Sequence, residues 1–312
     1  MNRLFICLVI ALATAAPTQA QEGHPAACLI EIKITVWPAG LEGRDPESSA
    51  HKIEGGGFLV SKEGHVVTCK HVASPVDKIY ECLNRKYLNA LYSNEGLVAI
   101  NRIAFSITVL TGTGQEFTTT YEPDFVIEPT DDLDTPTFLI RQQEKRDLAD
   151  TDRELHIVSV GTSDIMLLKL HSACPLPYLT WSDTPVIYRR NDPKKMTRVQ
   201  SAVVSRLDDA RRYMTGRNAG YVLGDQQKDL KISGLASYDV RMFSRKGHSG
   251  YPVLNESDDK LAGMIWGHDP IWPGSRVASI TFVAKPIAVR PFVKAAIAKP
   301  NFDSRRIVNL NP

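Results

Sequence analysis

Two glycines bracket a serine at Gly247, Ser249 and Gly250, directly before an apolar run over residues 251–254. Glycine permits a sharp backbone turn, and it lets a substrate carbonyl come close to main-chain N–H groups. A serine hydroxyl is a weak nucleophile until a base removes its proton, so this serine matters only beside a histidine and an orienting carboxylate. The segment therefore demands a fold that brings distant side chains to one turn.

Both partners occur upstream, each at the end of an apolar segment. His71 follows a short apolar strand, and Asp164 precedes the apolar run 165–170. Asp152 and Asp183 lie near Asp164, but the orienting carboxylate belongs at the mouth of a buried strand, which favours Asp164. The chain order is His, Asp, Ser, whereas the α/β-hydrolases have the order Ser, Asp, His.

These segments resemble those of the chymotrypsin-like (trypsin-fold) serine peptidases, especially the bacterial extracytoplasmic branch that includes the HtrA-type proteases. The matching stretches are residues 55–71, 163–170 and 247–267, and the resemblance spans roughly residues 50–298. It implies an all-β fold of two six-stranded antiparallel β-barrels followed by a C-terminal helix. Tyr251 departs from the pattern, because it stands where the family has a glycine.

The resemblance implies a serine endopeptidase that works through an acyl-enzyme intermediate. His71 would accept the hydroxyl proton of Ser249, and Asp164 would hold the imidazole in place. The N–H groups of Gly247 and Ser249 would form the oxyanion hole. The expected partner is a protein or peptide substrate, and this chemistry needs no cofactor. The alternative is a catalytically inactive binding protein, in which Tyr251 or an insertion spoils the triad; the same fold also supports acyl-ester hydrolysis.

The resemblance also places the first substrate pocket between two segments. Its base lies at Phe243 and Ser244, and its opposite wall follows the strand end at Trp266, Gly267 and His268. A preference for Lys or Arg is disfavoured, because an unpaired cation buried beside Phe243 would be costly. We expect an apolar or small substrate residue in this pocket.

The first twenty residues predict a cleaved secretory signal peptide. Arg3 supplies the positive start, residues 4–16 the apolar stretch, and residues 18–20 the small-residue cleavage site. The apolar stretch is shorter than the roughly 20 residues needed to cross a bilayer. We therefore expect a periplasmic or secreted protein without membrane association after cleavage.

The rest of the chain, from residue 21 to residue 312, predicts a single peptidase domain. Residues 29–37 alternate apolar and polar side chains, as a half-buried strand does. We expect the N-terminal barrel over about residues 29–184, the C-terminal barrel over 185–284 and a helix over 285–298, with no PDZ-like module attached. Residues 122–154, rich in proline and acidic residues, predict an insertion that either decorates the barrel or gates substrate access.

Four cysteines remain once the signal peptide has gone: Cys28, Cys69, Cys82 and Cys174. An even number in an oxidising compartment predicts two disulfides, for which three pairings exist. We expect Cys69–Cys82 behind His71, and Cys28–Cys174 tying the N-terminal arm to the barrel.

Charge and ligand spacing argue against two other classes of partner. The formal net charge of +2 gives no reason to expect nucleic acid or an anionic membrane. A zinc site from His65, Cys69, His71 and Cys82 lacks a paired Cys-x-x-Cys or His-x-x-x-His spacing, so we expect no metal. The oligomeric state is not encoded in any pattern that we recognise.

Overall fold

The computed structural model describes residues 23–38, 51–74, 77–78, 100–121, 139–140, 154–188, 195–207, 213–225, 234–269, 280–301 and 308–309. The predicted signal peptide, Cys82 and nearly all of the predicted insertion lie outside these residues.

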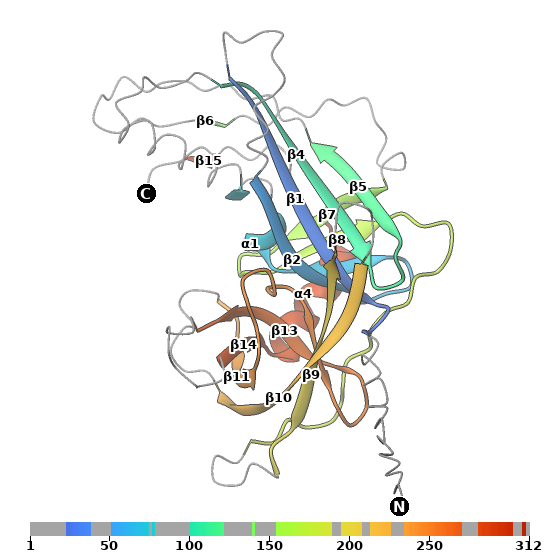
Figure 1. Cartoon of the computed structure of the whole chain (residues 1–312), viewed down its shortest axis with the longest axis vertical. Coiled ribbons are helices and arrows are strands. Elements are labelled where there is room, and N and C mark those ends of the chain that lie inside the picture. Colours follow the sequence, from blue (N-terminus) through green and yellow to red (C-terminus); the bar gives the residue numbers. More distant parts are fainter. Residues whose placement is uncertain are drawn as a thin grey trace, which may run out of the picture.

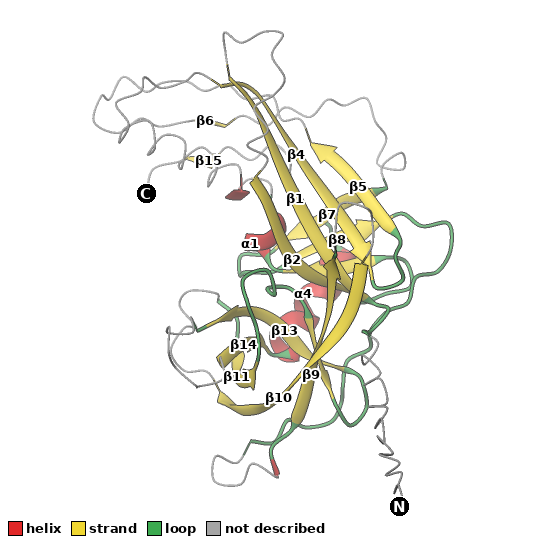
Figure 2. Ribbon diagram, in the orientation of Figure 1, coloured by secondary structure: helices red, strands yellow, loops and turns green. Residues whose placement is uncertain are grey.

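The described chain is mostly β-structure, with few helices (Figure 2). The N-terminal half contains β1 (Ala27–Pro38), β2 (His51–Leu59), β3 (His65–Thr68), α1 (Lys70–Ala73), β4 (Ile100–Thr111), β5 (Glu116–Tyr121), β6 (Leu139–Ile140), β7 (Leu155–Val160) and β8 (Met166–Leu170). The C-terminal half contains β9 (Arg198–Arg206), β10 (Tyr213–Asp225), β11 (Ser237–Met242), β12 (Pro252–Asn255), β13 (Leu261–His268), β14 (Ile280–Ala284), α4 (Pro286–Ala298) and β15 (Val308–Asn309).

The first half forms a barrel-like antiparallel sheet of seven strands in the order β5-β4-β1-β2-β3-β8-β7. Its long strand β1 buries Ile30, Ile32 and Ile34 on one face, as the predicted alternation requires. The edge strands β5 and β7 approach each other, and the Thr118 N–H donates a hydrogen bond of 3.1 Å to the carboxylate of Glu154, just before β7. This first barrel was predicted to have six strands, and its sheet has seven.

The second half is a closed barrel of six strands in the order β10-β11-β14-β13-β12-β9, as predicted. Helix α4 follows it and buries Val289, Val293 and Ala296; it packs on β13 of this barrel and on β7 of the first sheet. Figure 1 shows the first sheet in blue to green above the second barrel in yellow to red. The predicted all-β architecture of two antiparallel barrels with a C-terminal helix is therefore confirmed. No helix among the described residues is long and apolar enough to span a membrane.

The predicted disulfides are not formed in the described part of the chain. Cys28, Cys69 and Cys174 are all free thiols. The Cys28–Cys174 disulfide is not formed: Cys28 is buried in β1, where its thiol contacts the Ala26 carbonyl (3.7 Å), and Cys174 is exposed. Cys69 is buried and unpaired as well, and its expected partner Cys82 lies outside the described residues.

Candidate active site

Strand register places His71 beside Asp164. Strands β3 and β8 pair antiparallel, with Thr68 at the end of β3 opposite Met166 at the start of β8. The single-turn helix α1 carries His71 just beyond one strand end, and Asp164 lies just before the other. The apolar residues that bury these two strands therefore also bring the two polar side chains to the same edge of the sheet.

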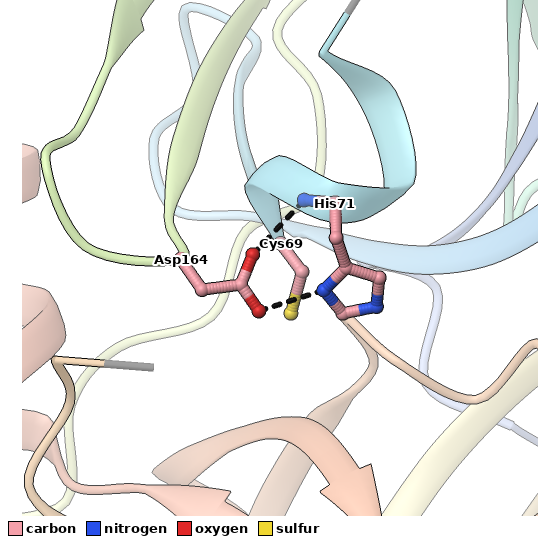
Figure 3. Close-up of side chains that lie close together, drawn as sticks. All are labelled: Cys69, His71 and Asp164. Atoms are coloured by element: carbon pink, nitrogen blue, oxygen red, sulfur yellow. Dashed lines mark hydrogen bonds and ion pairs between the residues drawn. The ribbon is translucent and has the colours of Figure 1, made fainter. Parts of the chain in front are cut away.

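His71 and Asp164 are joined by two hydrogen bonds (Figure 3). The His71 backbone N–H donates to Oδ1 of Asp164 at 2.9 Å, and the ring Nδ1 lies 2.7 Å from Oδ2. Burial alone raises the pKa of the Asp164 carboxyl, but the hydrogen bonds from His71 and the electrostatic effects of His71 and Lys70 outweigh it and hold this pKa below its usual value. An ionised carboxylate accepts, so Nδ1 donates and Nε2 is left as the proton acceptor.

The structure also distinguishes Asp164 from Asp152 and Asp183, the two other aspartates near it in the sequence. Asp183 is largely exposed and lies 4.0 Å from Arg290, in an ion pair on the surface. Asp152 lies outside the described residues. Of the candidates that are described, Asp164 is the carboxylate that reaches the histidine.

Ser249 lies in the second of two consecutive tight turns that precede β12. Gly247 and Gly250 occupy these turns with φ values of 94° and 95°, a region that favours glycine because a side chain would clash there. A Cβ at Gly250 would also lie only 2.0 Å from the Gly56 carbonyl oxygen. Both glycines that flank the serine are thus required by backbone geometry.

The serine turn is held between the two halves of the molecule. The Gly56 N–H in β2 donates to the Ser249 carbonyl at 2.7 Å, and the Thr68 hydroxyl in β3 donates to the Gly56 carbonyl at 2.7 Å. On the other side, the Gly250 N–H donates to the Ile265 carbonyl in β13 at 2.6 Å. These bonds fix the serine backbone relative to the strand that leads into α1.

The Ser249 hydroxyl donates a hydrogen bond to the Trp266 carbonyl at 3.4 Å. In the described part of the chain, no hydrogen bond joins this hydroxyl to His71. The N–H groups of Gly247 and Ser249 likewise have no acceptor among the described residues. The structure thus brings together two of the three predicted triad members, His71 and Asp164.

Phe243 and Ser244, the predicted base of the substrate pocket, have opposite environments. Phe243 is 55% exposed, whereas Ser244 is buried. The Ser244 hydroxyl lies 2.9 Å from the Thr281 hydroxyl on β14, which also donates to the Met242 carbonyl at 2.8 Å. This end of β11 therefore presents neutral hydroxyl groups and an exposed aromatic ring.

Trp266, Gly267 and His268, the predicted opposite wall, form the partly exposed end of β13. The Trp266 indole N–H donates to the Ser237 hydroxyl at 2.7 Å, and its ring packs on Phe282 with centroids 5.3 Å apart. The indole is thereby fixed in orientation at the edge of the barrel.

His248, directly before Ser249, is a feature whose environment the sequence did not reveal. It is only 7% exposed, its Nδ1 has no hydrogen-bond partner, and its ring meets Phe243 and Tyr251 edge-on at 6.3 and 6.0 Å. Burial, with smaller electrostatic effects of Arg245 and His268, lowers the pKa of His248 to about 4. At neutral pH the residue is therefore an uncharged part of the serine turn.

Tyr251, the departure from the family pattern, is accommodated without entering the site. Its ring is buried and lies against Gly56, where an added Cβ would come within 2.3 Å of it. Its hydroxyl donates to the Val204 carbonyl in β9, and burial raises its pKa. The Tyr251 side chain fills the junction between the two halves. Strand β2 can approach the Tyr251 ring only because residue 56 is glycine.

Comparisons with known proteins give likenesses in structure but none in sequence. No protein-family model matches the chain, and no curated protein matches it in sequence. Among solved structures, the HtrA-type protease AlgW with a decapeptide is similar, with a TM-score of 0.48 and 11% sequence identity. The match covers 89% of this chain and 65% of that one, so this chain spans just under two thirds of the length of the matched protein.

Proposed function

We propose that this protein is a serine endopeptidase that hydrolyses peptide bonds through a His71–Asp164–Ser249 triad. The observation that carries the proposal is the pair of hydrogen bonds from His71 to Asp164, at 2.7 and 2.9 Å. Together they fix the imidazole position, its orientation and its tautomer, which a general base in acyl transfer requires. A histidine exposed by chance needs none of these constraints.

The proposed reaction follows from this geometry. Nε2 of His71 takes the Ser249 hydroxyl proton as the oxygen attacks the substrate carbonyl, and the negative oxygen is received by the N–H groups of Gly247 and Ser249. The imidazolium, stabilised by Asp164, then gives its proton to the leaving amine. Water repeats the sequence on the acyl-enzyme and releases the second product.

The proposed mechanism requires the Ser249 hydroxyl to leave the Trp266 carbonyl and turn to His71. The Ser249 bond to Trp266 is long, at 3.4 Å, and such bonds are weak. Catalytic hydrogen bonds are often loose without substrate and shorten in the complex. On this proposal, substrate binding turns the side chain of Ser249, whose backbone is held by Gly56.

The substrate proposal is a peptide or protein chain with an apolar or small residue at the cleavage site. Ser244 and Thr281 supply buried neutral hydroxyls rather than a carboxylate, so a buried Lys or Arg would lack a counter-charge there. The predicted signal peptide places the proposed enzyme in the periplasm or outside the cell.

The alternative function is a binding protein that keeps the fold and does no chemistry. One observation favours it, namely that in the described residues the Ser249 hydroxyl contacts Trp266 rather than His71. If the hydroxyl kept this position with substrate bound, the nucleophile would never be activated.

A fluorophosphonate probe distinguishes the two functions, because it reacts only with an activated serine. The chain from residue 21 should be labelled rapidly at pH 7–8, and labelling should be lost in Ser249→Ala and in His71→Ala. Ser172→Ala, a serine change in the loop after β8, is the matched control and should be labelled like the unaltered protein. A folded protein that is not labelled, or a Ser249→Ala variant labelled as fast as the parent, would refute the peptidase proposal.

A further inference from the structure

The His71–Asp164 pair has a third neighbour that the proposed hydrolysis does not use. Cys69, the residue between β3 and α1, places its sulfur beside the pair (Figure 3). One ligand atom each from Cys69, His71 and Asp164 lie within 4.8 Å of one another. The thiol is wholly buried and donates to the Ile265 carbonyl at 3.3 Å.

We propose that Cys69, His71 and Asp164 bind a Zn²⁺ ion that switches the site off. Sulfur, imidazole nitrogen and carboxylate oxygen are the three ligand types that Zn²⁺ prefers, at roughly 2.0–2.3 Å from the metal. Three atoms at such distances around one tetrahedral ion lie roughly 3–4 Å apart, so modest side-chain rotations close the cluster. Binding itself needs only these residues; its inhibitory effect rests on the proposed peptidase function.

This zinc site differs from the set His65, Cys69, His71 and Cys82 that was considered from the sequence. His65 is not part of it, because its Nδ1 lies 2.7 Å from the Ser61 hydroxyl in the β2–β3 turn. Asp164 takes its place, contributed by the residues just before β8, nearly a hundred positions away. Pairing of β3 with β8, rather than proximity in the sequence, assembles the ligand set.

The charges of the cluster suit a divalent ion. A Cys69 thiolate and the Asp164 carboxylate together carry two negative charges, which offset the two positive charges of Zn²⁺. Offsetting them matters because an uncompensated ion in a partly buried place is costly. Mg²⁺ and Ca²⁺ prefer all-oxygen ligand sets, so the thiol and the imidazole select a softer metal.

Zinc binding and general-base catalysis exclude each other at His71. When the ion takes Nδ1, the imidazole proton moves from Nδ1 to Nε2, and the Cys69 thiol loses its proton to solvent, so one proton is released overall. Nε2 then carries a hydrogen and cannot accept the proton of Ser249. The side chain of His71 is 47% exposed, so the ion enters from the histidine side and displaces the Nδ1–H···Oδ2 bond.

The metal site can be tested without reference to activity. Co²⁺ bound by a thiolate gives a near-ultraviolet charge-transfer band, and Zn²⁺ displaces Co²⁺ from shared sites. Titration of Ser249→Ala, which keeps all three ligands, should develop this band with one equivalent of Co²⁺, and Zn²⁺ should abolish it. Adding Cys69→Ser should remove the band, whereas adding Cys174→Ala, which removes the exposed thiol, should leave it unchanged.

Circular dichroism of the Cys69→Ser protein, whose side chain is nearly the same size, checks that loss of the band is not loss of the fold. Absence of the band in folded Ser249→Ala, or its persistence in Cys69→Ser, would overturn the zinc site. Zn²⁺ should also suppress fluorophosphonate labelling of the parent, and Cys69→Ser should raise the inhibitory concentration by roughly 10-fold or more. If the protein shows the charge-transfer band but is never labelled, the metal site is supported and the peptidase proposal is refuted. If it is labelled but shows no band, the peptidase proposal is supported and the metal site is refuted.

Discussion

The buried imidazole of His248 predicts a loss of stability in mild acid. An unfolded chain presents a histidine with a pKa near 6.5, whereas burial lowers the pKa of His248 in the folded protein to about 4. Below about pH 6.5 the unfolded state therefore binds a proton that the folded state refuses, and stability falls as the pH falls. The loss is complete only below about pH 4, where both states are protonated.

Its magnitude follows from the two pKa values. Each tenfold difference in proton affinity corresponds to about 1.36 kcal/mol, so the full effect is about 3 kcal/mol, and about 2 kcal/mol of it is reached at pH 5. The change that removes it is His248→Phe, which keeps a planar ring between Phe243 and Tyr251 and has no nitrogen to protonate.

The assay is urea unfolding followed by tryptophan fluorescence at pH 7.5 and pH 5. Other histidines titrate in both proteins, so the quantity to compare is the change in unfolding free energy between the two pH values. The parent should lose about 2 kcal/mol more than His248→Phe over this interval. Equal losses in the two proteins would show that His248 is accessible to protons in the folded state and would refute the reasoning.

Three further changes test the junction and the proposed triad. Thr68→Val removes the hydroxyl that donates to the Gly56 carbonyl and should cost about 1–3 kcal/mol in urea unfolding, whereas Thr68→Ser should retain most of the stability. Gly250→Ala should cost roughly 3 kcal/mol or more of stability and lower the melting temperature, because it combines a positive φ with a 2.0 Å backbone clash. Gly216→Ala, whose Cβ meets nothing within 3.4 Å, is the control. Equal decreases in melting temperature in the two variants would contradict the argument. Asp164→Asn should slow fluorophosphonate labelling by roughly 10³- to 10⁴-fold while leaving the protein folded, and an unchanged rate would remove this carboxylate from the proposed mechanism.

Strands with a clear apolar alternation could be predicted from the sequence, and those without one could not. Over residues 30–34, β1 alternates buried and more exposed side chains, so this part of its pattern was visible before the structure. β10 spans Tyr213–Asp225 with mostly half-buried residues, because it pairs with β9 and β11 through its backbone while many of its side chains stay partly exposed. Backbone pairing of this kind leaves little trace in side-chain hydrophobicity.

The contact between His71 and Asp164 was predictable for a similar reason, since each residue adjoins an apolar strand. The neighbourhood of Cys69 was not. Counting cysteines suggested disulfides, but whether a thiol meets another thiol or a carboxylate depends on which strands pair. The direction of the Ser249 hydroxyl was equally hidden, because a side-chain rotation leaves no pattern in the sequence.

Stability and the proposed activity depend on the same few atoms at the junction of the two halves. The carbonyl of Ser249 is bound by Gly56, whose own carbonyl is bound by Thr68, three residues before His71. A shift of β2 relative to the serine turn would therefore break a buried hydrogen bond and move the nucleophile relative to the base at the same time. Since a 1 Å displacement of a reacting group can cost about 10²-fold in rate, variants at Thr68 should lose labelling rate before they lose the fold.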